Sequence, residues 1–90
     1  MWIKTQNRRA IINADNYDGF SVGEDIENFT VMARKDCVAF QGSYGLMGAV
    51  RKIGTYKSSS KAFVVVAEIY EKIAADEKTY ELPTDEDCGV

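Results

Sequence analysis

The clearest pattern in the sequence is an amphipathic helix in its second half, over residues 62–75. One side of its helical projection carries the apolar residues Val65, Val66, Ile69, Tyr70 and Ile73. The opposite side carries the charged residues Lys61, Glu68, Glu71 and Lys72. Ser58, Ser59 and Ser60 precede the helix, and each is an acceptable N-cap. The helix therefore has one face to bury.

Short β-prone runs fill the chain before this helix. They are residues 2–5, 10–13, 17–22, 28–34, 37–41 and 49–56. The run from residue 28 alternates clearly, with Phe29, Val31 and Ala33 on one face. After the helix, residues 78–82 read as an edge strand that ends at Pro83. The pattern predicts an α+β fold, with a meander of about five or six short antiparallel strands, one long helix packed on it, and a short final strand.

The chain of 90 residues is long enough for one domain, which we place at residues 1–83. Residues 84–90 read as an acidic, disordered tail. A domain of this size gains little net stability from its own core, so association is expected. Phe63, Val64 and Ala67 make the apolar surface of the helix wider than one sheet face needs. A covering loop is one explanation, but we favour a homo-oligomer with these three residues in the interface.

The sequence contains no histidine. This removes the usual general base, the usual activator of a serine or cysteine nucleophile, and the commonest metal ligand. Two cysteines are too few for a disulfide framework, and their spacing does not fit a zinc site. We therefore expect a protein that is not an enzyme, has no cofactor or metal, and works in a reducing cytoplasm. The longest uncharged run, residues 37–50, is too short for a membrane helix.

The net charge of −3 argues against direct nucleic-acid binding. Residues 42–48 nevertheless have glycine at every third position and are followed closely by Arg51 and Lys52. Such a loop suits a nucleotide-like ligand, with Tyr44 stacking on a base and Arg51 or Lys52 meeting phosphate. The expected ligand-binding residues are Gly42, Tyr44, Gly45, Gly48, Arg51 and Lys52. The alternative is a hairpin connection that binds nothing.

Three segments carry a resemblance to known proteins. Residues 1–7 read MWIKTQN, residues 53–56 read IGTY before a serine turn and an alanine-led helix, and residues 80–83 read YELP before an acidic end. The chain resembles a group of small, mostly uncharacterised proteins from phages, prophages and mobile elements of Gram-positive bacteria. The likeness covers about half of the chain. It does not include the glycine-rich segment, so no role there is implied by it.

The resemblance implies an accessory protein that acts in the cytoplasm of a bacterial host. Our leading hypothesis is a counter-defence protein that sequesters a nucleotide-derived immune signal without turnover. The first alternative is an inhibitor that binds a host defence nuclease through protein-protein contact, in the manner of an anti-CRISPR protein. The second alternative is a structural or regulatory phage protein. None of these functions requires a membrane.

Overall fold

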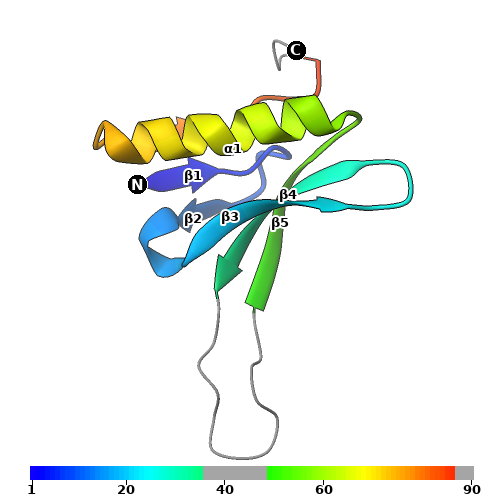
Figure 1. Ribbon diagram of the computed structural model, residues 1–90. Coiled ribbons are helices and arrows are strands. Elements are labelled where there is room, and N and C mark those ends of the chain that lie inside the picture. Colours follow the sequence, from blue (N-terminus) through cyan, green and yellow to red (C-terminus); the bar gives the residue numbers. More distant parts are fainter. Residues whose placement is uncertain (36–48, 87–90) are drawn as a thin grey trace, which may run out of the picture.

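A computed structural model describes residues 1–35 and 49–86 (Figure 1). These residues form an α+β fold, as the hydrophobic pattern predicts. Its elements are β1 (Trp2–Lys4), β2 (Ile11–Asn13), η1 (Ala14–Asn16), β3 (Gly19–Glu24), β4 (Phe29–Lys35), β5 (Ala49–Tyr56), α1 (Ser59–Ala74) and β6 (Thr79–Glu81). The strand expected at residues 37–41 lies outside the described residues.

The strands form two three-stranded sheets in place of one meander. One sheet has the order β3-β4-β5 and is antiparallel throughout. The other has the order β2-β1-β6, in which β1 pairs antiparallel with β2 and parallel with β6. Ile3 lies opposite both Ile12 and Tyr80. A parallel pair needs a long connection between its strands, and here β1 and β6 are connected by the whole intervening part of the chain. The edge position predicted for the last strand is confirmed.

The helix α1 begins and ends with specific backbone contacts. The Ser58 side chain accepts a hydrogen bond from the Lys61 N–H at 3.2 Å, which confirms a serine N-cap. At the other end Asp76 adopts a left-handed conformation with φ 58°, and its N–H donates to the Ile73 carbonyl at 3.0 Å. This turn satisfies a free carbonyl and stops the helix.

The buried face of α1 is narrower than the sequence predicts. Ala62, Val65 and Ile69 are buried, whereas the side chain of Tyr70 is 73% exposed and that of Ile73 is 48% exposed. The prediction that Tyr70 and Ile73 belong to the buried face is therefore wrong. The physical reason is that α1 packs against β3, β4 and β5 through Ala62, Val65 and Ile69, with Val64 and Val66 partly buried beside them, so that Tyr70 and Ile73 lie at the margin of the contact.

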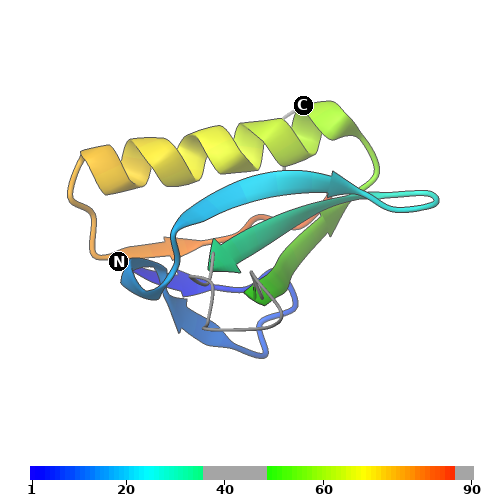
Figure 2. The same ribbon diagram turned by 60° about the horizontal axis from the view of Figure 1, so that its bottom comes forward.

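One hydrophobic core joins α1 and both sheets. All strands lie on the same side of α1, as Figures 1 and 2 show from two directions. The largest fully buried side chains are Tyr56, Ile3, Ile69, Leu82, Val31 and Val65. The Tyr56 hydroxyl donates to the Pro83 carbonyl at 2.7 Å, so this buried ring also holds the segment after β6. Each sheet thus depends on the other for its buried face.

The ordered contacts extend beyond the boundary that we expected at Pro83. The Lys57 N–H donates to Asp85 Oδ1 at 3.0 Å, and Lys61 Nζ donates to the Asp85 carbonyl at 2.8 Å. These bonds tie Asp85 to the turn before α1 and to its first helical turn. Asp85, one of the acidic residues of the expected tail, therefore accepts one hydrogen bond from a backbone N–H and one from a side-chain ammonium group.

In the part of the chain that the structure describes, no helix is long and apolar enough to cross a membrane.

Candidate functional site

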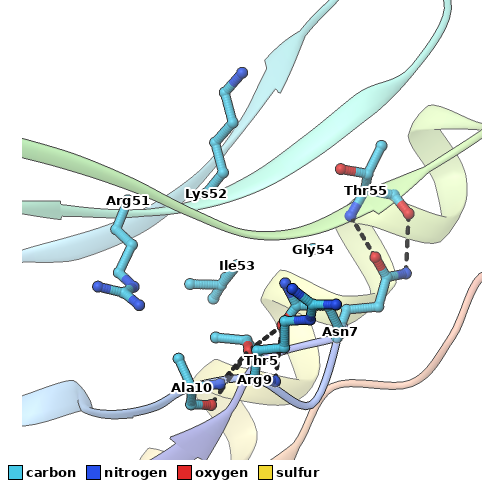
Figure 3. A pocket seen from close by; sticks show the side chains of 10 residues that line it. Thr5, Asn7, Arg9, Ala10, Arg51, Lys52, Ile53, Gly54 and Thr55 are labelled. Atoms are coloured by element: carbon cyan, nitrogen blue, oxygen red, sulfur yellow. Dashed lines mark hydrogen bonds between the residues drawn. The ribbon is translucent and has the colours of Figure 1, made fainter.

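A pocket of about 380 Å³ lies between the turn that joins β1 to β2 and the edge strand β5 (Figure 3). Its described lining comes from residues 5–7, Arg9 and Ala10 in the turn, and from residues 51–55 in β5. Arg9, Arg51 and Lys52 are basic, and no residue of this described lining is acidic. In a chain with a net charge of −3, the pocket is a local concentration of positive charge.

Asn7 organises the turn that forms one wall. The Thr5 hydroxyl donates to Asn7 Oδ1 at 2.8 Å, and the Arg9 N–H donates to the same oxygen at 3.0 Å. Arg8 takes a left-handed conformation with φ 63°, which reverses the chain between them. Thr5 itself is buried. The backbone N–H of Arg9 is therefore held by the Asn7 side chain, whereas the Arg9 side chain is exposed.

The side chain of Gln6 connects this turn to β5. Gln6 Nε2 donates to the Thr55 carbonyl at 2.9 Å, and Gln6 Oε1 accepts from the Thr55 N–H at 2.8 Å. The Gln6 backbone N–H also donates to the Ile53 carbonyl at 2.9 Å. The carboxamide has the same donor and acceptor as a peptide group, so it pairs with Thr55 as a neighbouring strand would. These three bonds hold the two walls of the pocket together.

A β-bulge in β5 determines which basic side chain faces the turn. In the pairing with β4, Gly54 lies opposite Val31 and Lys52 lies opposite Met32, so Ile53 has no partner. The extra residue reverses the alternation of the strand beyond it. Arg51 consequently shares a face with the buried Ala33, its cross-strand partner. Figure 3 shows Arg51 on the side of the turn and Lys52 pointing to the opposite side of β5.

The two guanidinium groups that remain on the pocket side are Arg9 and Arg51. Both side chains are exposed at the pocket. Arg8 is directed elsewhere, because its Nη1 lies 2.9 Å from Glu81 Oε1 and donates to the Leu82 carbonyl at 3.0 Å. Guanidinium groups present paired donors that match the oxygens of phosphate. The described lining combines these two guanidinium groups with no carboxylate, so this arrangement suits binding of an anion.

The structure places the residues predicted to bind a ligand in different positions, and it does not describe all of them. Arg51 lies in the pocket, whereas Lys52 contributes to its lining but extends its side chain away from Arg51. The other four predicted residues, Gly42, Tyr44, Gly45 and Gly48, lie outside the described residues.

The turn residues of the pocket were not predicted as part of a site. Arg9 belongs to a basic pair that the sequence shows plainly, but it is more than forty residues from Arg51. A single sequence contains no signal that brings these two arginines together. The sequence also does not indicate that Thr5, Gln6 and Asn7 make the hydrogen bonds that shape this turn, because short polar residues between two strands are typical of any hairpin.

The three helix residues predicted to form an oligomer interface differ in their surroundings. Phe63 is 60% exposed and Ala67 is exposed, so both are accessible to a partner. Val64 is only partly exposed because it packs against the core.

No group of three acidic or cysteine side chains in the described parts of the chain is placed to hold a metal ion. Comparison with known proteins places the chain in no group: no family model, no curated protein and no solved structure matches it.

Proposed function

We propose that this protein binds a small phosphate-bearing ligand in the pocket between the β1–β2 turn and β5. The observation that carries the proposal is that Arg9 and Arg51, from distant segments, both line a pocket whose described lining has no carboxylate. In a chain with an excess of acidic residues, two arginines that share a pocket with no acidic residue in its described lining are well suited to an anion from solution. The phosphate would meet both guanidinium groups, while the fixed turn keeps Arg9 in place.

The resemblance to phage and mobile-element proteins suggests the class of ligand. We infer that the ligand is a nucleotide-derived immune signal, and that the protein acts in counter-defence in the cytoplasm of a bacterial host. The protein would act by stoichiometric sequestration. Absence of histidine from the sequence supports binding without turnover, because the usual proton carrier is missing.

Recovery of bound nucleotides tests this proposal. The purified protein is incubated with cyclic and linear nucleotides, separated from free ligand, and denatured to release what it holds. We expect an intact nucleotide to be recovered, with less retained as the salt concentration rises, since phosphate contacts are screened. Failure to retain any nucleotide, or recovery of a converted product, would contradict sequestration. Protein that is denatured before the incubation serves as the control for non-specific carry-over of nucleotide.

A second candidate function rests on the turn between β3 and β4, which projects from the rest of the molecule in both views (Figures 1 and 2). Ile26 at this turn is 95% exposed, and Glu24, Asp25 and Glu27 around it are exposed as well. The turn is ordered, because the Asp25 N–H donates to the Asn28 carbonyl at 2.8 Å. An apolar side chain surrounded by carboxylates favours contact with a basic groove, such as that of a defence nuclease.

The Ile26→Ser variant tests this second function against a purified defence nuclease that the parent protein inhibits. We expect it to weaken inhibition by about tenfold or more, because a buried isoleucine contributes about 1.5 to 3 kcal/mol. Neutralising Glu24, Asp25 and Glu27 together should weaken inhibition and its salt dependence, whereas Glu77→Gln, an exposed acid beyond the helix, should change neither. If the parent inhibits a nuclease and the turn variants inhibit it equally well, this surface is not the inhibitory one.

A further inference from the structure

An apolar stripe runs along the outer face of α1. It consists of Phe63, Ala67, Tyr70 and Ala74, and all four are exposed, Phe63 at 60% and Tyr70 at 73%. Successive members are four, three and four residues apart, which is the spacing of a seam between two packed helices. The residues that bury α1 in its own core, Ala62, Val65 and Ile69, are different ones. The stripe is therefore a second packing surface on the same helix.

The side chains of the stripe alternate between large and small. Phe63 and Tyr70 are aromatic, whereas Ala67 and Ala74 are the smallest side chains that a helix favours. A second helix that runs antiparallel, with a two-fold axis between Ala67 and Tyr70, places each aromatic ring against an alanine of the other copy. Ala67 then meets the partner's Tyr70, and Phe63 meets the partner's Ala74. Two identical stripes fit each other in this register without a clash, as an isologous interface requires.

The charge of the stripe is compatible with a second copy as the occupant. The stripe contains no charged residue, so two copies can meet there without burying an ion. Each chain carries a net charge of −3, and two chains therefore repel one another at long range. Because salt screens that repulsion and leaves apolar contact intact, association through the stripe should strengthen as salt is added. This response is opposite to that of an interface held by opposite charges.

The available area sets the strength of the contact. Phe and Tyr each bury about 150 to 250 Å² when fully covered. Phe63 is 60% exposed and Tyr70 is 73% exposed, so the two rings offer about 270 Å² per copy. Two copies would bury about 540 Å² through these rings, below the roughly 1,200 to 2,000 Å² of stable complexes. Ile73, which is 48% exposed, also borders a groove of about 420 Å³ beside β3 that contains Tyr17 and Phe20. A partner helix at the edge of this groove adds some apolar area, and the expected complex is reversible.

We propose that the stripe of Phe63, Ala67, Tyr70 and Ala74 is a self-association surface, through which two copies of the chain pair by antiparallel helices. The dimer is in exchange with the monomer, because the area that it buries is below that of stable complexes. This inference is independent of the anion pocket, which lies at the β1–β2 turn and β5.

Exchange of the paired residues tests the register. Ala67→Tyr sets two aromatic rings against each other across the axis and should weaken association about tenfold or more, despite its larger apolar area. The double variant Ala67→Tyr/Tyr70→Ala restores a large-to-small contact and should recover most of the parent affinity. Ala75→Tyr, the same substitution at an exposed position off the stripe, should leave association unchanged. Sedimentation equilibrium over a range of protein and salt concentrations measures the dissociation constant of the parent and of each variant. Circular dichroism checks that each variant keeps its helix.

Three results would overturn the proposal. The first is a parent protein that stays monomeric at millimolar concentration in high salt. The second is stronger association of Ala67→Tyr, which identifies a non-specific apolar patch. The third is failure of the double variant to recover affinity although it is folded, which excludes the antiparallel register. The salt response of the parent needs no variant, so the proposal stays testable if a substitution impairs folding.

Discussion

Replacing Arg9 and Arg51 together by alanine is expected to weaken nucleotide binding by about 100-fold or more. Loss of one charged hydrogen-bond partner costs about 1.5 to 3 kcal/mol, or roughly 10- to 150-fold in affinity. The two arginines come from different walls of the pocket, and each single variant should therefore show a separate part of the loss. Isothermal titration with the nucleotide recovered from the parent protein gives the affinities of the parent, the two single variants and the double variant.

Lys52→Ala is the matched control for this experiment. Lys52 is adjacent to Arg51 and has the same charge, but the bulge at Ile53 directs it to the other side of β5. We expect its removal to change affinity by less than about threefold, through long-range electrostatics alone. If Lys52→Ala were as damaging as Arg51→Ala, the ligand would lie on the opposite face of β5 and the pocket would not be the binding site.

Truncation of Tyr56 to alanine is expected to lower the free energy of unfolding by about 3 to 5 kcal/mol. The side chain is fully buried among residues of both sheets and α1, and its removal leaves a large cavity. A small domain has about 5 to 15 kcal/mol in total, so this variant should lose a large share of its stability at 25 °C. Chemical denaturation followed by circular dichroism measures the loss.

Two companion variants separate packing from hydrogen bonding. Tyr56→Phe keeps the ring but removes the 2.7 Å bond to the Pro83 carbonyl, and it should cost about 0.5 to 1.5 kcal/mol. Tyr70→Ala removes a tyrosine that is 73% exposed, and in dilute solution it should change stability by less than about 0.5 kcal/mol. Equal losses for Tyr56→Ala and Tyr56→Phe would show that the hydroxyl, and not the burial of the ring, sustains this part of the core.

The sequence predicts those elements whose pattern is long enough to read. The helix, its serine N-cap and the strand at residues 49–56 are all confirmed, because each has either a full helical repeat or a clear boundary signal. Three-residue strands such as β1 and β6 contain one buried position each, Ile3 and Tyr80. One position cannot specify a partner or a direction. The division into two sheets and the parallel β1–β6 pair were therefore not predictable from local patterns.

The candidate site shows the same limit at the level of one residue. Arg51 and Lys52 are equivalent in a sequence, since both are basic and follow the glycine-rich segment. Adjacent strand residues point to opposite faces, and the unpaired Ile53 determines that Arg51, and not Lys52, is the one on the side of the turn. A bulge depends on the strand opposite, so β5 alone contains no sign of it. The exposure of Tyr70 was not predictable for a similar reason. The hydrophobic pattern gives the width of the apolar surface of the helix, but it does not show which part of that surface packs against the sheets.

The position of β1 between β2 and β6 also affects the order of folding. The β1–β2 hairpin can form early, because its strands are close in the chain and joined by a short turn. The other edge of β1 stays open until residues 79–81 arrive, after the rest of the domain has been made. Contacts of such long sequence separation slow folding, because the entropy of loop closure is lost before they form. During synthesis, the first strand to leave the ribosome thus waits for the last one.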